Sequence, residues 1–263
     1  MASLKLLFSL VVLSSVLSIQ ASYPSFEDNG VNVLESKKVN LSLYYETLCP
    51  SCASFIVNEL AAKLFDPEGD LISIVNLRLV PYGNAQVKAP NKTIVCQHGP
   101  DECYFNSIEA CAIHLWSDVV RPSFFYHKSK KRHFKFIRCL ESKLIEGLHS
   151  SKEYAWESCC VKLKMDSDRL GNCYRSGYEK KLILENAKET DHLVPPHEYV
   201  PWVVVNGQPL KDDYLNFVRY VCNAYKDSPK PKACGSYPHN INSGGKANSS
   251  LEGCYKGEER GGS

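Results

Sequence analysis

Alternating apolar and polar residues mark the first segment in which the sequence predicts regular structure. Residues 41 to 45 alternate as a half-buried strand does, and after Cys49-Pro50-Ser51-Cys52 the apolar residues recur at helical spacing. That helical stripe consists of Ile56, Val57, Leu60, Ala61 and Leu64. Residues 66 to 70 break the helix, and residues 71 to 82 are apolar enough for a strand inside a sheet. A strand, a helix and a strand in this order predict a right-handed βαβ unit with parallel strands.

A helical pattern replaces the sheet pattern between about residues 83 and 196, and this region holds more than half of the twelve cysteines. Four helices are predicted here. In the first, Asp101 is the N-cap and Tyr104, Ile108, Cys111 and Leu115 share a face, and in the second the apolar stripe is Ile137, Leu140, Leu144 and Leu148. The third follows a capping box at residues 150 to 153 and runs through Cys159 and Cys160, and the fourth spans Ser167 to Ala187. We therefore predict a helical insertion tied down by disulfides. The basic run from Lys128 to Arg132 is expected to be a solvated loop, with a partner-binding patch as the alternative.

Sheet character returns at residues 199 to 207, where Pro201 precedes a β-branched run, a position that a strand tolerates. Residues 211 to 225 then have the periodicity of an amphipathic helix. Residues 227 to 263 are rich in Gly, Pro, Ser and Lys, so we predict a poorly ordered tail that Cys222, Cys234 and Cys254 tether in part. The main domain is expected to span residues 38 to 226.

The N-terminus predicts entry into the secretory pathway. Lys5 precedes an apolar run, and the small residues Ala21 and Ser22 offer a cleavage point, so residues 1 to 22 are predicted to be a signal peptide. A membrane anchor is the alternative, but polar residues shorten the run below the ~20 apolar residues that a span needs. Residues 23 to 37 are expected to be a flexible mature N-terminus.

Composition and charge agree with a protein of the secretory pathway. Twelve cysteines favour an oxidising compartment, so we expect a lumenal or secreted protein without stable membrane insertion. The formal net charge of +2 gives no reason to expect a nucleic-acid partner or an anionic membrane. Asn40, Asn91 and Asn248 stand in glycosylation sequons, and Asn91 is the strongest candidate because it lies in a predicted loop.

The Cys49-Pro50-Ser51-Cys52 segment is the candidate catalytic centre. Cys49 stands at the start of the predicted helix, and Pro50 suits the first helical position. The free N–H groups and the helix dipole favour a thiolate there and lower the pKa of the Cys49 thiol. We expect Cys49 to attack a substrate disulfide and Cys52 to resolve the mixed disulfide. Half of a zinc site and a buried structural pair are the alternatives.

The order of the elements resembles the thioredoxin fold, so the predicted fold class is α/β, thioredoxin-like, with a disulfide-stapled helical insertion. In that fold the residue before the later strand is a cis-proline that lies against the Cys-x-x-Cys. The resemblance implies that Pro201 is cis and that the backbone of Val200 offers a short strand edge to the substrate cysteine. The alternative is an ordinary trans proline, because most X-Pro bonds are trans.

A second motif, from Cys96 to Asn106, has the sequence CQHGPDECYFN. It resembles the signature C-Q-H-G-x-x-E-C-x-x-N of the gamma-interferon-inducible lysosomal thiol reductase (GILT) family, and every specified position is present: Cys96, Gln97, His98, Gly99, Glu102, Cys103 and Asn106. With the Cys-x-x-Cys upstream and residues 199 to 203 downstream, the similarity runs from about Val39 to Tyr225.

The signature is expected to be structural. We predict that Cys96 and Cys103 enter disulfides, that His98 and Glu102 hold a loop or a helix N-terminus, and that Asn106 bonds the backbone. A zinc site made of Cys96, His98, Cys103 and Cys111 is the alternative, although the spacing is not a common zinc pattern, and no metal is assigned. Ten cysteines besides the catalytic pair allow five bridges of undetermined connectivity, with Cys159 and Cys160 not joined to each other.

The family resemblance implies an enzyme that reduces protein disulfides in an acidic endosomal, lysosomal or vacuolar lumen without a cofactor. Its partners would be disulfide-containing protein substrates and a small-thiol or protein reductant. At pH 5, lowering a thiol pKa from ~8.5 to ~5 gains roughly a hundredfold in rate after the loss of nucleophilicity. The competing functions are a lumenal disulfide oxidase or isomerase, and a non-catalytic, disulfide-stapled secreted binding protein.

Overall fold

The computed structural model describes residues 38–117, 131–147, 151–236 and 253–257. All of them belong to the compact unit Ser36–Ser263. The predicted signal peptide, the predicted mature N-terminus, most of the basic run at 128–132, Leu148 and Asn248 lie outside the described residues.

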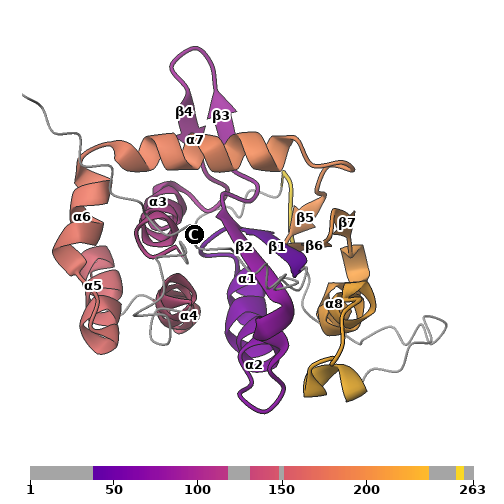
Figure 1. The fold of residues 1–263 in the computed structure, drawn as a ribbon. Coiled ribbons are helices and arrows are strands. Elements are labelled where there is room, and N and C mark those ends of the chain that lie inside the picture. The colour runs from indigo at the N-terminus through magenta and orange to yellow at the C-terminus, as the bar shows by residue number, and fades with distance from the viewer. Residues whose placement is uncertain (1–37, 118–130, 148–150, 237–252, 258–263) are drawn as a thin grey trace, which may run out of the picture. The chain divides into compact units, whose positions relative to one another are not determined.

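A four-stranded sheet in the order β2-β1-β6-β7 is the centre of the fold (Figure 1). Its strands are β1 (Val39–Tyr45), β2 (Val75–Pro81), β6 (Trp202–Val205) and β7 (Gln208–Pro209). β1 and β2 are parallel, whereas β6 runs antiparallel to β1 and to β7. The predicted parallel βαβ unit is confirmed, and a parallel pair followed by an antiparallel hairpin on the same sheet is the thioredoxin-like arrangement.

The helix of the βαβ unit begins directly after Cys49. It comprises α1 (Pro50–Ser54), a π-helical segment η1 (Phe55–Leu60) and α2 (Ala61–Leu64). Pro50 occupies the first turn and Cys49 is the N-cap, as predicted. The expected strand at 71–82 starts later, because the 3-10 turn η2 (Leu71–Ile74) follows Asp70, whose backbone is left-handed with φ 49°.

The side chains of β1 alternate between two apolar clusters on opposite faces of the sheet. Leu41, Leu43 and Tyr45 belong to the main core, and Tyr44 belongs to a smaller cluster. The smaller cluster consists of Tyr44, Val80, Tyr199, Trp202 and Val204. The predicted helix at 211–225 consists of a 3-10 segment η3 (Lys211–Asn216) and α8 (Phe217–Ala224). Both segments pack on the helix after Cys49, since the ring of Phe55 lies 5.3 Å from that of Tyr214 and 5.9 Å from that of Phe217.

Among the described residues, the insertion comprises a hairpin and five helices, and Figure 1 shows how they are arranged. The elements are β3 (Gln86–Lys88), β4 (Thr93–Val95), α3 (Pro100–Leu115), α4 (Arg132–Ile145), α5 (Lys152–Leu163), α6 (Ser167–Arg175) and α7 (Tyr178–Asp191). The hairpin was not predicted from the sequence. The single helix expected at 167–187 is wrong, because Gly177 between α6 and α7 adopts a left-handed backbone with φ 78°.

Two capping predictions have different outcomes. Ser151 caps α5 and accepts a hydrogen bond from the N–H of Tyr154 at 3.2 Å, as expected for a capping serine. The N-cap of α3 is Gly99, so the prediction of Asp101 is wrong. Asp101 lies inside the first turn and pairs with the Lys152 Nζ at 2.7 Å.

Five disulfides form, and their pairing corrects the cysteine assignments. They are Cys49–Cys254, Cys96–Cys103, Cys111–Cys173, Cys139–Cys159 and Cys222–Cys234, and the free cysteines are Cys52 and Cys160. The bridges between α3 and α6 and between α4 and α5 confirm the stapled insertion. Because Cys96, Cys103 and Cys111 are oxidised, the alternative of a zinc site that uses their thiolates is wrong.

The predicted low-order tail includes two ordered parts. A 3-10 turn η4 (Lys232–Ser236) is bridged to α8 through Cys222–Cys234. Further along, β8 (Cys254–Tyr255) pairs antiparallel with β5 (Tyr199–Val200). Both parts are held by disulfides, so the prediction that Cys222, Cys234 and Cys254 tether parts of the tail is confirmed.

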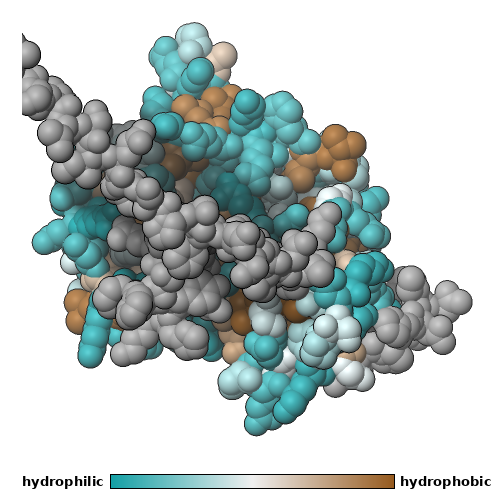
Figure 2. Space-filling model, viewed as in Figure 1, coloured by the Kyte–Doolittle hydropathy of each residue, from teal (hydrophilic) through white to brown (hydrophobic). Residues whose placement is uncertain are grey.

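The surface of the described residues is largely hydrophilic on one face (Figure 2) and carries scattered exposed apolar side chains. On the face shown in Figure 2 the described residues are mainly hydrophilic. The exposed apolar side chains are spread over separate elements, such as Val161 in α5 and Val194 after α7. Within the described ranges, no helix has the length and apolar character needed to cross a bilayer.

Candidate redox site

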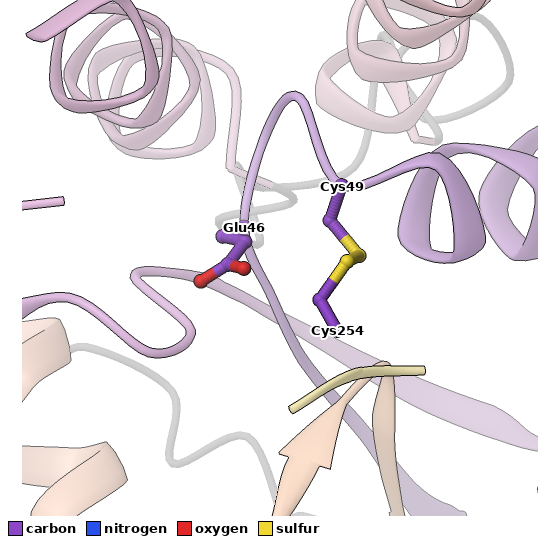
Figure 3. A group of neighbouring side chains, drawn as sticks. All are labelled: Glu46, Cys49 and Cys254. Atoms are coloured by element: carbon purple, nitrogen blue, oxygen red, sulfur yellow. A yellow bond between two sulfur atoms is a disulfide. The ribbon is translucent and has the colours of Figure 1, made fainter. Parts of the chain in front are cut away.

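Cys49 lies in the turn between β1 and α1, and its sulfur is not exposed to solvent. The side chain is fully buried, and its Sγ is bonded to the Sγ of Cys254. Figure 3 shows Glu46 before the turn, Cys49 at the start of the helix, and Cys254 reaching Cys49 from β8. The sequence analysis expected Cys49 to pair with Cys52, and the disulfide to Cys254 corrects that pairing for the state described here.

The edge of β5 lies beside this disulfide. The Val200–Pro201 peptide bond is cis, as predicted, and the Val200 carbonyl oxygen lies 3.9 Å from the Cys49 Sγ. Val200 is opposite Cys254 in the register, and Tyr199 is opposite Tyr255. A cysteine-bearing strand thus lies on the backbone edge that the fold resemblance assigned to a substrate cysteine.

Cys52 lies on the first turn of the helix and keeps a free thiol. Its side chain has no exposed surface. Burial, and then the charge of Glu46, raise the pKa of the Cys52 thiol well above its usual value, while a hydrogen bond from the Glu46 backbone opposes the shift. Cys52 is therefore a protonated thiol, three residues along the helix from a disulfide-bonded Cys49.

The Cys-Gln-His-Gly segment and α3 hold the turn that carries Cys49. Asn106 accepts hydrogen bonds from the N–H of Thr47 at 2.9 Å and from its hydroxyl at 3.1 Å. Glu102 accepts from the backbone N–H of His98 at 2.6 Å, and its other oxygen accepts from the Asn106 amide at 3.3 Å. His98 and Glu102 are thus joined by a hydrogen bond within the loop, and the Asn106 side chain bonds the backbone of Thr47.

Glu46 is a buried carboxyl group beside the redox sulfurs. One of its oxygens and the Sγ atoms of Cys49 and Cys254 all lie within 4.8 Å of one another. Burial, and then the charge of Glu102, raise the pKa of Glu46 to about 9, so the carboxyl group is protonated at neutral and acidic pH. The backbone N–H of Asn84 donates to its Oε2 at 2.6 Å.

Gly83 permits this close approach between the two loops. Its backbone is left-handed with φ +58°, and a Cβ at this position would lie 2.4 Å from the Oε2 of Glu46. Both the conformation and the space therefore require glycine. The loop that contains Gly83 and Asn84 thus contacts the carboxyl group of Glu46, which lies beside the disulfide.

One group at the site has the composition of a cation site. Ligand atoms of Glu46, His98 and Glu102 lie within 4.8 Å of one another. Hydrogen bonds already account for the arrangement, because the Nδ1 of His98 lies 2.9 Å from Glu102 and Glu46 is protonated and bonded to Asn84. We assign no metal to it.

Comparisons with known proteins identify the family. Residues 40–163 match the family model described as gamma interferon inducible lysosomal thiol reductase (GILT). An Arabidopsis thaliana gamma-interferon-responsive lysosomal thiol protein is 43% identical over 81% of this chain and 82% of its own length. The mouse (Mus musculus) gamma-interferon-inducible lysosomal thiol reductase is 34% identical over 84% of this chain and 78% of its own length. The chain belongs to the GILT family. It is therefore an oxidoreductase that acts on sulfur groups.

Solved structures with some similarity include a Chlamydia trachomatis DsbA, with 17% identity and a TM-score of 0.45 over 69% of this chain and 85% of that one. The reduced form of DsbG from Mycobacterium tuberculosis has 14% identity and a TM-score of 0.46 over 77% of this chain and 85% of that one.

The GILT signature surrounds the redox centre rather than forming a separate motif. The Cys96–Cys103 disulfide closes the loop at the start of α3, and Gly99 is the N-cap of that helix. The Nε2 of Gln97 donates a hydrogen bond to the carbonyl oxygen of Tyr255 in β8. Of the sequons, Asn40 on β1 and Asn91 in the β3–β4 turn are exposed. Sequence analysis missed Glu46, Asn84 and the partner of Cys49. The available signal for Glu46 was a charged residue directly after the strand and before the Cys-x-x-Cys turn.

Proposed function

We propose that the protein reduces disulfides of substrate proteins in an acidic lumenal compartment, with Cys49 as the attacking thiol and Cys52 as the resolving thiol. The observation that carries the proposal is the disulfide from Cys49, at the N-cap of a helix, to a cysteine on the edge of β5. A mixed disulfide with a substrate needs this arrangement: an outer sulfur on a strand edge, and a second thiol behind the attacking one.

The chemistry proceeds in two exchanges. The Cys49 thiolate attacks one sulfur of the substrate disulfide and releases the other as a thiolate. The Cys52 sulfur, after losing its proton, attacks Cys49, forms Cys49–Cys52 and releases the substrate cysteine. The protonated carboxyl of Glu46 lies beside the sulfurs and supplies a proton to the leaving thiolate. A small-thiol or protein reductant then restores the dithiol.

Buried carboxyl groups support an acidic compartment. Glu46, Glu109 and Glu141 have no exposed surface, and burial is the largest cause that raises the pKa of each. An acid whose pKa is raised on folding contributes stability that is complete below its unfolded pKa and is lost as the pH rises toward the folded value. The fold is thus favoured in acidic surroundings.

Insulin reduction at pH 5 and pH 7, with free cysteine as the reductant, tests this function. We expect Cys49→Ser to lower the rate to the uncatalysed background and Cys52→Ser to leave Cys49 in a mixed disulfide. Cys160→Ser is the matched control, since Cys160 is the other buried free thiol, and it should retain activity. Equal, mild losses from Cys49→Ser and Cys52→Ser would refute the assignment. Activity only in the oxidative direction would favour an oxidase, and none in either direction a binding protein.

A further inference from the structure

The segment Gly253–Gly257 occupies the place beside Cys49 where a substrate strand would lie. Cys254 is buried, is bonded to Cys49, and pairs in register with Val200. The backbone N–H of Lys256 extends the pairing by donating to the Glu198 carbonyl oxygen at 3.2 Å. This segment is therefore bound through its main chain as well as through its sulfur.

Two side-chain amides bind consecutive carbonyl groups of the segment. The Nδ2 of Asn84 donates to the Cys254 carbonyl oxygen at 2.9 Å, and the Nε2 of Gln97 donates to the Tyr255 carbonyl oxygen at 2.7 Å. Asn84 also donates to the Oε1 of Gln97 at 2.6 Å, which joins the two amides. Because these contacts involve only the main chain of the segment, they would be available to any extended peptide.

Tyr199 restricts the residues on both sides of the bound cysteine. A Cβ on Gly253 would lie 2.9 Å from the Cδ2 of Tyr199 and 3.1 Å from the Val200 carbonyl oxygen, so a side chain at that position displaces the ring. The ring of Tyr255 lies 5.4 Å from that of Tyr199, and its residue is 45% exposed. The geometry favours glycine before the cysteine and an aromatic residue after it.

We infer that Asn84, Gln97 and the edge of β5 form a binding site for the main chain of an extended, cysteine-containing peptide, which the chain's own Gly253–Gly257 segment occupies as an internal substrate. This inference rests on the proposed function of Cys49 and names the substrate class: strands in which glycine precedes and an aromatic residue follows the reacting cysteine. Gln97 of the GILT signature thereby acts as a substrate-positioning residue.

Opening the occupied site requires one thiol-disulfide exchange. The Cys52 sulfur, as a thiolate, attacks the Cys49 Sγ, the Cys49–Cys254 bond breaks, and the Cys49–Cys52 bond forms. Cys254 leaves as a thiolate and takes up a proton, so one thiol replaces another and no electrons are gained or lost. Two equivalents of a small thiol then reduce Cys49–Cys52 and leave as one small-molecule disulfide.

Peptide binding without turnover separates this inference from the proposed function. The probe is acetyl-Gly-Ser-Tyr-Lys-Gly-amide, which repeats residues 253 to 257 with serine in place of the cysteine. We expect the full-length Cys254→Ser protein, whose own segment is no longer held by a covalent bond, to bind the probe more tightly than the oxidised wild type, in which the disulfide holds the segment in place. In the Cys254→Ser protein, Gln97→Leu should weaken binding roughly 2- to 10-fold, the range for one lost hydrogen bond. Gln208→Leu, an exposed glutamine on β7, is the matched control and should not change it.

Kinetics with the Cys254→Ser protein test the same contacts during turnover. The substrates are the Gly-Cys-Tyr-Lys-Gly peptide in a disulfide with 2-mercaptoethanol, and hydroxyethyl disulfide, which has no main chain. Gln97→Leu should raise KM for the peptide several-fold more than for hydroxyethyl disulfide. A peptide with valine in place of the glycine should lose about 10-fold or more in kcat/KM. Tyr199→Ala should reduce that discrimination, because it removes the ring, but not abolish it, because the Val200 carbonyl oxygen remains close.

The disulfide itself is tested in the Cys52→Ser protein, where the exchange is blocked. Peptide mapping under non-reducing conditions should find Cys49 joined to Cys254 whenever Cys222–Cys234 has formed. A free Cys49 in that sample, equal binding of the serine peptide by wild type and Cys254→Ser, or equal rates for the glycine and valine peptides would overturn the inference. If binding follows the expectation while no disulfide is reduced, the proposed function fails and the peptide site stands.

Discussion

The buried carboxyl groups of Glu109 and Glu141 predict an unusual pH dependence of stability. Both side chains lie in the core without exposed surface, on α3 and α4. Tyr45 donates its hydroxyl to the Oε2 of Glu109 at 2.6 Å, and the protonated carboxyl group of Glu141 forms a side-chain hydrogen bond with Glu109. Burial, and then the charge of Glu109, raise the pKa of Glu141 well above its ordinary value. The folded protein therefore keeps Glu141 protonated.

The magnitude follows from the proton that the unfolded chain loses. In the unfolded state Glu141 ionises near its ordinary pKa of 4.5. The stabilisation from this group is thus complete below pH 4.5 and is lost progressively as the pH rises toward the higher folded pKa. Each pH unit over which the folded protein retains a proton that the unfolded chain has lost costs about 1.4 kcal/mol.

Glu141→Gln removes the titration and keeps the shape of the side chain. We expect the free energy of unfolding of the variant, relative to wild type, to rise between pH 5 and pH 7, by at most about 1.4 kcal/mol per pH unit. The measurement is urea unfolding of the oxidised protein at pH 5, 6 and 7, followed by tryptophan fluorescence. Glu68→Gln, at an exposed position in the loop after α2, is the control and should leave the pH slope unchanged.

An identical pH slope for wild type and Glu141→Gln would refute the reasoning. It would mean that Glu141 ionises in the folded protein at the same pH as in the unfolded chain. A constant offset between the two proteins at all three pH values would report only the packing of the amide, because packing does not depend on a proton.

Two further predictions concern the loops that hold Cys49. Gly83→Ala should destabilise the protein by more than Gly207→Ala. Both positions have positive φ, but only at Gly83 would the added Cβ lie against another side chain. Urea unfolding should show a loss of about 1 to 2 kcal/mol in the free energy of unfolding for Gly207→Ala and a larger loss for Gly83→Ala. Asn106→Leu should lower the free energy of unfolding by about 1 to 3 kcal/mol and slow insulin reduction, since the buried N–H of Thr47 loses its acceptor; unchanged stability would contradict this role.

The periodicity of apolar residues along the chain predicts most of the strands and helices that form the interior. The alternation of β1, the helix after Cys49, the later strand at 202–205 and the stapled helices all follow from periodicity and cysteine content. The differences lie where one residue changes the backbone locally. Asp70 turns the chain before β2, and Gly177 divides one predicted helix into two, although neither disturbs the apolar periodicity from which the elements were predicted.

Sequence alone determined the thioredoxin-like order of elements, the position of Cys49 at a helix start, and the GILT signature, because each depends on residues close together in the chain. Only the tertiary structure decided that Cys49 bonds Cys254 across 205 residues, and that Glu46, Asn84 and Gln97 meet beside that bond. Periodicity carries no information about which distant segments meet, since that choice is made by packing and by the closure of a long loop. The fold could therefore be predicted from local pattern, whereas the occupant of the redox site could not.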